Sequence, residues 1–199
     1  MKLRFSPTSP FVRKVLATAI EAGVAGRIEK IPTQTADPSL VKDNPLAKVP
    51  ALVTDDGGQL YDSPVICEYL DNLGGKAKLF PAPGAARWKA LRRQALADGI
   101  MDATVAVFAE NRRPENERSP SFVDKQMDKV RNAVTQFEGE AADLGGPVTI
   151  GHVALGCALG YLDLRFPETA WRRQAPKLAK WYETFATRPS MKESAPPAG

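Results

Sequence analysis

The chain has 199 residues, 43% of them hydrophobic and 25% charged, with a formal net charge of +4. These ordinary globular values exclude a disordered or fibrous chain, and the length permits one domain or two small ones. A single histidine excludes a multi-histidine metal site, and two distant cysteines fit reduced core thiols better than a disulfide framework. Basic residues occur as pairs such as Arg112-Arg113 rather than as a stripe with aromatics, which argues against nucleic acid as a partner.

The sequence contains no stretch that is expected to enter a membrane. Polar and proline positions follow Phe5 directly, so the N-terminal residues lack the apolar core of a secretory signal. The longest apolar stretch, Val153 to Leu162, is shorter than the roughly 20 residues that a membrane-spanning helix needs. We therefore expect a cytoplasmic protein.

Alternating apolar and polar residues at the start of the chain predict a first strand around Leu3 and Phe5. Helical spacing of apolar residues from Pro10 onward predicts a helix, and Gly23 ends it because glycine readily takes the left-handed conformation found after helices. Ile28 to Ile31 then forms a second strand, which is expected to run parallel to the first because a helix separates them.

After a short helical turn that Asn44-Pro45 closes, two strands are expected at Ala51 to Thr54 and Gln59 to Tyr61. The two glycines between these strands favour an antiparallel hairpin. Ser63-Pro64 begins another helix, and Gly74-Gly75 ends it. The order of elements is therefore βαβ followed by ββα.

The residues from Lys76 to Gly84 have no periodicity and contain two prolines, which marks a boundary in the chain. Beyond it only helical patterns occur, at 85–111, 121–142, 149–164 and 176–187, and Arg188-Pro189 is expected to stop the last one. The third pattern is apolar on nearly every side and predicts a buried helix. We therefore predict an α/β domain at residues 1–75, a linker at 76–84 and an all-helical bundle domain at 85–199.

Ser9 and Pro10 stand where the first strand leads into the first helix. Serine is a preferred N-cap and proline a preferred first helical residue, so capping alone accounts for both. A helix N-terminus also stabilises a bound anion such as a thiolate, to which a serine hydroxyl can donate. Lowering a thiol pKa by about two units needs only about 2.7 kcal/mol, which a hydroxyl and a helix end can supply. Spacing alone leaves both roles open.

Two further segments that contain proline also allow a structural or a functional interpretation. Val49-Pro50 precedes a strand, and because most X–Pro bonds are trans, the sequence by itself favours a trans bond there. Asp62-Ser63-Pro64 again presents a capping serine followed by proline, with an acid just outside the helix. In a functional interpretation, Ser63 and the helix end hold a carboxylate while Asp62 faces an ammonium group, as an α-amino acid end requires.

These segments together resemble the glutathione transferases. Thr8 to Lys14, Asn44 to Pro50 and Asp62-Ser63 occur in the order and at the spacing found in that family. The helical second half ends in Arg188-Pro189-Ser190, so the likeness covers essentially the whole chain. The chain resembles bacterial, cytosolic members with a serine-type site. It implies a thioredoxin-like first domain with a cis bond before Pro50, and a homodimer with the long helix from Ala85 in its interface.

The resemblance also implies a glutathione site. In the family, the backbone of the residue before the cis proline pairs with the cysteinyl part of glutathione, which here makes Val49 and Pro50 binding residues. Asp62 and Ser63 take the γ-glutamyl end, and Lys48 lies near the glycyl carboxylate.

The thiolate itself is assigned to the start of the first helix. Ser9 carries the hydroxyl that stabilises it, with the adjacent Thr8 as the alternative donor, and Phe11 is counted among the glutathione-binding residues. Asp98, on the long helix, is expected to reach the amino group of the glutathione bound to a partner subunit. Glutathione is thus the co-substrate, and no metal is needed.

The activity implied is conjugation of the glutathione thiolate to a small hydrophobic electrophile, a detoxification reaction that holding both reactants together accelerates. An electrophile pocket is expected between the domains, lined by Phe108, Asn111 and Tyr161. A glutathione-dependent peroxidase, dehalogenase or isomerase on the same fold remains an alternative, as does a non-catalytic scaffold. A working glutathione site is favoured over a scaffold by the presence of Ser9, Lys48, Asp62 and Ser63.

The sequence departs from related patterns at two points. Thioredoxins and glutaredoxins have cysteine where this chain has Ser9, which excludes dithiol exchange by that route. The family's helical domain usually has aspartate three residues after the capping Ser or Thr, whereas here His152 follows Thr149. A neutral imidazole can accept a backbone N–H bond, so His152 is interpreted as structural rather than catalytic.

Overall fold

The computed structural model describes residues 1–34, 36–75 and 78–197, and these form two compact units. The first unit comprises residues 1–88 and 188–199, and the second comprises residues 89–187. The predicted linker, 76–84, begins with two residues outside the described part, and the predicted helical domain, 85–199, ends with two more. The predicted domain boundaries stay a prediction, and the compact units differ from them in assigning the chain after Thr187 to the first unit.

The first unit contains one mixed sheet of four strands in the order β2-β1-β3-β4. Its strands are β1 (Lys2–Phe5), β2 (Glu29–Pro32), β3 (Ala51–Val53) and β4 (Gln59–Leu60). β2 pairs parallel to β1, as predicted from the helix between them, whereas β3 pairs antiparallel to β1 and β4 antiparallel to β3. The predicted hairpin of the last two strands is therefore confirmed.

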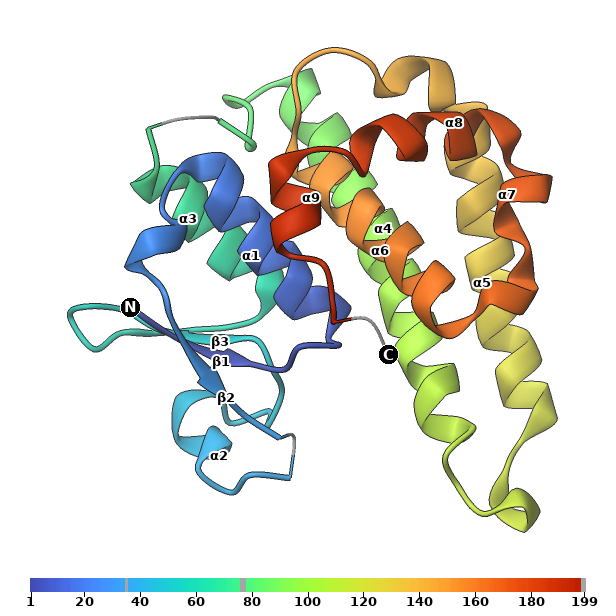
Figure 1. Ribbon diagram of the computed structural model, residues 1–199, viewed down its shortest axis with the longest axis horizontal. Coiled ribbons are helices and arrows are strands. Elements are labelled where there is room, and N and C mark those ends of the chain that lie inside the picture. The colour runs from blue at the N-terminus through green and yellow to red at the C-terminus, as the bar shows by residue number, and fades with distance from the viewer. Residues whose placement is uncertain (35, 76–77, 198–199) are drawn as a thin grey trace. The chain divides into compact units, whose positions relative to one another are not determined.

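Two helices cover one side of this sheet and a short one lies on the other (Figure 1). α1 (Pro10–Ala22) and α3 (Ser63–Leu73) pack against each other, while α2 (Leu40–Asp43) is the short helix that Asn44-Pro45 closes. Gly23 ends α1 with a φ of 78°, the left-handed conformation predicted for it. Gly74 lets the helices approach, because a Cβ there would lie 2.7 Å from the Cβ of Ala22.

A final helix returns to the first unit. α9 (Pro189–Glu193) contacts α1, and Arg13 Nη2 of α1 donates to the carbonyl oxygen of Met191 at 3.1 Å. Glu21 accepts hydrogen bonds from Arg188 at 2.8 and 2.9 Å and from Ser190 Oγ at 2.6 Å. The helix predicted at 176–187 does end before Arg188-Pro189, since α8 (Pro176–Phe185) stops at Phe185. It is not the last helix as expected, because Pro189 takes the first position of α9, where proline is favoured.

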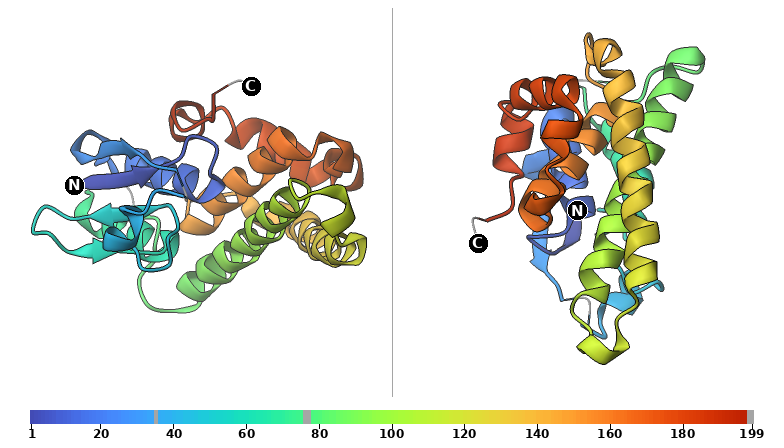
Figure 2. Two further views of the ribbon diagram at one scale, coloured as in Figure 1. Left: turned by 90° about the horizontal axis from the view of Figure 1, so that it is seen from below. Right: turned by 90° about the vertical axis from the view of Figure 1, so that its right-hand side faces the viewer.

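The second unit consists of helices and the turns and loops that connect them. Its main helices are α4 (Ala85–Glu110), which begins in the first unit, α5 (Pro120–Gly139), α6 (Ile150–Arg165), α7 (Trp171–Gln174) and α8 (Pro176–Phe185). Short 3₁₀ turns occur at Ala25–Arg27 in the first unit and at Glu115–Glu117, Ala141–Leu144 and Pro167–Thr169 in the second. α4 and α5 run in opposite directions, as Figures 1 and 2 both show. No strand follows Leu60 in the described part of the chain, as the loss of alternating pattern predicted.

α6 forms the buried centre of this unit. Every residue from Ile150 to Leu162 is buried, which confirms the prediction made from its apolar pattern. Gly151 permits a close contact with α4, since a Cβ there would lie 2.7 Å from the Cβ of Arg93 and 2.9 Å from the carbonyl oxygen of Ala90. Among the described residues, no helix is both long and apolar enough to cross a membrane.

Candidate functional site

The strand register brings three loops to one end of the sheet. Arg4, near the end of β1, pairs with Ala51 at the start of β3, and Leu52 of β3 pairs with Leu60 at the end of β4. The segments after β1, before β3 and after β4 therefore leave or enter the sheet at the same end. These segments carry Ser9, Val49-Pro50 and Asp62-Ser63, so sites far apart in the sequence share one edge.

Ser9 is the N-cap of α1, as predicted. Its Oγ accepts a hydrogen bond from the backbone N–H of Val12 at 3.3 Å, and Pro10 occupies the first helical position. A hydroxyl keeps its own proton available when it accepts such a bond, and no described residue accepts a hydrogen bond from Ser9 Oγ. The half-buried Ser9 thus has a donor to offer at a helix N-terminus, where partial positive charge favours an anion.

The loop before β3 is shaped by Asn44. Its Nδ2 donates to the carbonyl oxygen of Lys48 at 2.8 Å, and its Oδ1 accepts the N–H of Leu46 at 3.0 Å. The bond between Val49 and Pro50 is cis, so the trans bond favoured by proline statistics was wrong and the cis bond implied by the family resemblance is present. Lys48 is exposed and forms no ion pair within the described residues.

α3 begins at Ser63, whereas a helix capped by Ser63 would begin at Pro64. Asp62 is the N-cap, without a side-chain capping bond, and Ser63 is the first helical residue; the prediction that Ser63 caps the helix was therefore wrong. The bond between Tyr61 and Asp62 is also cis. Ser63 is 1% exposed, and its hydroxyl makes no hydrogen bond to a described residue, whereas Asp62 is exposed. A second helix N-terminus with a polar group thus lies at this end of the sheet.

Three other residues were predicted to bind glutathione: Thr8, Phe11 and Asp98. Thr8 and Phe11 are half-buried on either side of the start of α1, and the ammonium of Lys14 lies 5.8 Å from the centre of the Phe11 ring. Asp98 is a half-buried residue of α4 in the second unit. The roles of all three in glutathione binding stay predictions.

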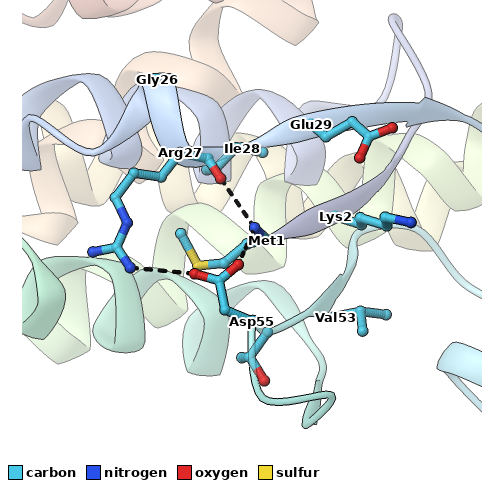
Figure 3. Close-up of a pocket in the computed structure, with 9 residues that line it drawn as sticks. Met1, Lys2, Gly26, Arg27, Ile28, Glu29, Val53 and Asp55 are labelled. Carbon is cyan, nitrogen blue, oxygen red and sulfur yellow. Dashed lines mark hydrogen bonds and ion pairs between the residues drawn. The ribbon is translucent and has the colours of Figure 1, made fainter.

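The opposite end of the sheet has a pocket of about 510 Å³ with a different character. As Figure 3 shows, Asp55 lies between the ammonium of Met1, which donates to it at 2.6 Å, and the guanidinium of Arg27 at 3.3 Å. The bond from the ammonium holds the pKa of the Asp55 carboxyl below its ordinary value. Met1, Arg27 and Asp55 of this pocket therefore neutralise one another in part.

The residues predicted to line an electrophile pocket lie in the second unit. Phe108 is half-buried on α4, Asn111 is exposed just after α4 ends, and Tyr161 is buried on α6. The guanidinium carbons of Arg165 and Arg112 lie 4.6 and 5.8 Å from the centre of the Phe108 ring. The sequence analysis did not single out the contact between Phe108 and Arg112, although their separation of four residues indicates neighbours on a helix.

Metal-binding residues are not clustered in the described part of the chain. No group of three or more His, Cys, Asp or Glu side chains there is arranged to hold a metal ion. Cys67 and Cys157 are both buried, as expected of core residues.

Comparison with known proteins supports the same architecture. A family model of the glutathione S-transferase N-terminal domain matches residues 8–73, and a model of the glutathione S-transferase C-terminal domain matches residues 99–184. The uncharacterized GST-like protein YibF of Escherichia coli K12 is 34% identical over 99% of both chains.

Two bacterial crystal structures extend the likeness. A glutathione transferase family member from Pseudomonas fluorescens Pf-5, with bound glutathione, is 42% identical, covers 99% of both chains and has a TM-score of 0.96. The same Pseudomonas protein with bound S-(propanoic acid)-glutathione has a TM-score of 0.92 and covers both chains fully.

A glutathione S-transferase from Methylobacillus flagellatus KT, also with glutathione bound, is 37% identical with a TM-score of 0.92, over 98% of this chain and 99% of that one. The first unit therefore has the thioredoxin-like fold expected of it, and the second is the family's helical domain. The chain belongs to the glutathione S-transferase family.

Proposed function

We propose that the protein is an enzyme that conjugates the thiolate of glutathione to small hydrophobic electrophiles. The observation that supports this most directly is the meeting of two helix N-termini and the loop before Pro50 at one end of the sheet. Both helix ends favour negative charge, and glutathione carries a thiolate and carboxylates. The bound glutathione in bacterial relatives that are 37% and 42% identical to this chain is consistent with this site.

Each residue has a distinct role in the proposal. Ser9 donates its hydroxyl proton to the sulfur, with Thr8 as the alternative donor, and the backbone of Val49 before Pro50 pairs with the cysteinyl part. Ser63 and the start of α3 bind the γ-glutamyl carboxylate while Asp62 faces the ammonium group.

The remaining roles lie outside this cluster. Lys48 attracts the glycyl carboxylate, Phe11 contacts the peptide, and Asp98 reaches the glutathione of a partner subunit in a homodimer. Phe108, Asn111 and Tyr161 contact the electrophile.

The chemistry follows from the charge at the start of α1. A donor hydroxyl and a helix end stabilise the thiolate over the thiol, which lowers the thiol pKa and raises the fraction of nucleophile at neutral pH. The sulfur then attacks an electrophilic carbon, so that a C–S bond forms and the leaving group departs with its bonding electrons. The thioether bound to the Pseudomonas relative, S-(propanoic acid)-glutathione, has the type of bond that such a reaction forms.

The first experiment is a calorimetric titration with glutathione of the wild type and of Ser9→Ala, Thr8→Val and Ser63→Ala, with Ser121→Ala as a distant control. Ser63→Ala is expected to weaken binding about tenfold, because a hydrogen bond to a carboxylate is lost. Ser9→Ala is expected to bind glutathione nearly normally but to shift the ultraviolet titration of the bound thiol to higher pH. A shift in Thr8→Val instead would make Thr8 the donor.

Product analysis then separates conjugation from its alternatives. The wild-type enzyme is expected to form the thioether from glutathione and chlorodinitrobenzene. The variant that lacks the thiolate donor is expected to form it more slowly. Oxidised glutathione formed with a hydroperoxide, and no thioether with any electrophile, would indicate a peroxidase instead. An absence of glutathione binding by the wild type would contradict the enzyme proposal and leave a scaffold on a transferase fold.

A further inference from the structure

A single buried residue, Asn44, connects the end of α2 to the loop that leads into β3. Asn44 is 1% exposed. Its backbone N–H donates to the carbonyl oxygen of Leu40 at 2.8 Å, and its carbonyl oxygen accepts the N–H of Ala47 at 2.9 Å. Its side chain bonds to the backbone of Leu46 and Lys48. Each polar group of Asn44 therefore has a partner on α2 or on this loop.

The helix that ends before Asn44 is held on the sheet by two side-chain hydrogen bonds. Arg4 Nε of β1 donates to Asp43 Oδ2 at 2.6 Å. Gln59 Nε2 of β4 donates to the carbonyl oxygen of Lys42 at 2.7 Å. Both acceptors lie directly before Asn44 in the chain. The position of Asn44 is thus fixed relative to the strands β1 and β4.

The hydrogen bond from Asn44 to Lys48 sets the direction of the next backbone N–H. The peptide group between Lys48 and Val49 is planar and trans, so its C=O and its N–H point in opposite directions. Because the C=O accepts from Asn44 Nδ2, the N–H of Val49 points away from Asn44. No described residue accepts a hydrogen bond from this N–H. The loop therefore presents a backbone donor that still requires an acceptor.

The conformation of Ala47 makes this loop depend on Asn44. Its φ of 51° lies in the left-handed region, which residues with a Cβ rarely adopt. Asn44 bonds to the residues on both sides of Ala47 and thereby holds it in this conformation. Without the side chain of Asn44, Ala47 is expected to relax to a commoner conformation. That change would rotate the peptide group between Lys48 and Val49.

We propose that Asn44 is a positioning residue for glutathione, because it directs the N–H of Val49 toward the cysteinyl part of the tripeptide. This inference rests on the proposed function, in which the backbone of Val49 pairs with that part of glutathione. A hydrogen bond weakens steeply as its donor turns away from the acceptor, so a rotated peptide group would bind glutathione less tightly. Asn44 acts through this peptide group, since its own polar atoms are already bonded.

The test begins with glutathione binding. Wild type, Asn44→Ala and Asn44→Asp are checked by thermal unfolding and then titrated with glutathione by calorimetry. Asn44→Asp keeps the acceptor for Leu46 but loses the donor to Lys48. Both variants are expected to bind glutathione about tenfold more weakly than the wild type. Asn72→Ala, which changes an exposed asparagine of the same unit, is the matched control and should bind as the wild type does.

A local measurement at Val49 separates positioning from a general loss of stability. Valine labelled at its backbone nitrogen is incorporated for NMR, and the Val49 amide signal is identified by its absence in Val49→Ala. Saturating glutathione is expected to slow hydrogen exchange of this amide about tenfold in the wild type and much less in Asn44→Ala. The ultraviolet titration of the bound thiol should be the same in Asn44→Ala as in the wild type, because Ser9 is unchanged.

The outcomes separate this inference from the function on which it rests. Folded Asn44 variants that bind glutathione as tightly as the wild type would overturn the positioning role alone. So would a Val49 amide that exchanges equally fast with and without glutathione in the wild type, a measurement that needs no variant at Asn44. Failure of the wild type to bind glutathione would overturn the proposed function and this inference with it.

Discussion

At the scale of single residues, the hydrogen bonds of His152 to Thr149 indicate a structural role for its imidazole ring. Its Nδ1 accepts the backbone N–H of Thr149 at 3.0 Å and lies 2.9 Å from Thr149 Oγ1. Its ring centre lies 6.2 Å from that of Trp181 and 6.5 Å from that of Phe185. An imidazole nitrogen that accepts a bond carries no proton, so the only histidine of the chain closes a capping box where the family usually has aspartate.

His152→Ala is expected to lower the melting temperature by removing both the cap and the aromatic contacts, at a cost of about 1–2 kcal/mol in the free energy of unfolding. His152→Asp should recover part of this loss, since a carboxylate can accept the same backbone N–H. Thermal unfolding followed by circular dichroism measures both effects. An unchanged melting temperature in His152→Ala would count against a structural role.

The local backbone geometry of the candidate site was predicted only in part. Ser9 caps α1 as expected, but Ser63 lies one position inside α3 rather than at its cap. Helix boundaries depend on small differences between neighbouring caps, and Asp62 and Ser63 are both good N-caps, so the sequence leaves this choice open. The cis bond before Pro50 was unpredictable from local sequence, because the intrinsic preference for trans is only about 0.5–1 kcal/mol.

At the scale of elements, the long helices and the strand order could be predicted, whereas the short helices could not. α7 has 4 residues and α9 has 5, which is too few to show a helical period. Each is tied by a side-chain hydrogen bond to a residue of another element. Trp171 of α7 donates to Asp163 at 2.9 Å, and Ser190 of α9 donates to Glu21.

Asp71 of α3 binds the backbone of the segment that follows this helix. Its side chain on α3 is 1% exposed and accepts the backbone N–H groups of Leu79 and Phe80 at 2.7 and 3.2 Å. Asp71→Asn presents an amide N–H to one of these donors, and it is expected to lower the free energy of unfolding by about 1–3 kcal/mol.

Urea unfolding measures the effect of Asp71→Asn, with the exposed neighbour variant Asn72→Ala as the control. Equal midpoints for the two variants would show that these hydrogen bonds do not stabilise the segment after α3.

At the scale of the whole molecule, stability in acid depends on Glu140. Its carboxylate follows α5 and accepts hydrogen bonds from Arg92 at 2.7 Å and from Arg93 at 3.0 Å, both on α4. Burial alone would raise the pKa of Glu140, but the bonds from Arg92, Gln136 and Arg93 outweigh it and lower the pKa from 4.5 to about 2. The folded state therefore favours the ionised carboxylate.

The direction of the pH effect follows from this depressed pKa. The stability that Glu140 contributes is fully present above pH 4.5, and it is lost as the pH falls through about 2. Glu140→Gln is expected to lower the free energy of unfolding by on the order of 1–2 kcal/mol at neutral pH, since solvent screens the half-exposed Arg92. The gap between wild type and variant should shrink as the pH falls below 4.5.

Urea unfolding at a series of pH values measures this gap. Asp128→Asn, which removes an exposed partner of Arg131, serves as the control and should change stability little. A gap of constant size from neutral to acid pH would refute the role assigned to the ionised Glu140.

The sequence by itself determined the order of elements, the buried character of α6 and membership of the family, because periodicity and caps depend on residues within a turn or two. Only the tertiary structure decided which segments share an end of the sheet, and that Arg165 of α6 meets Phe108 of α4. Those outcomes depend on contacts between distant residues, such as the bond from Arg13 to Met191 across 178 positions. No local pattern encodes such partners, since burial and strand register select them when the chain folds.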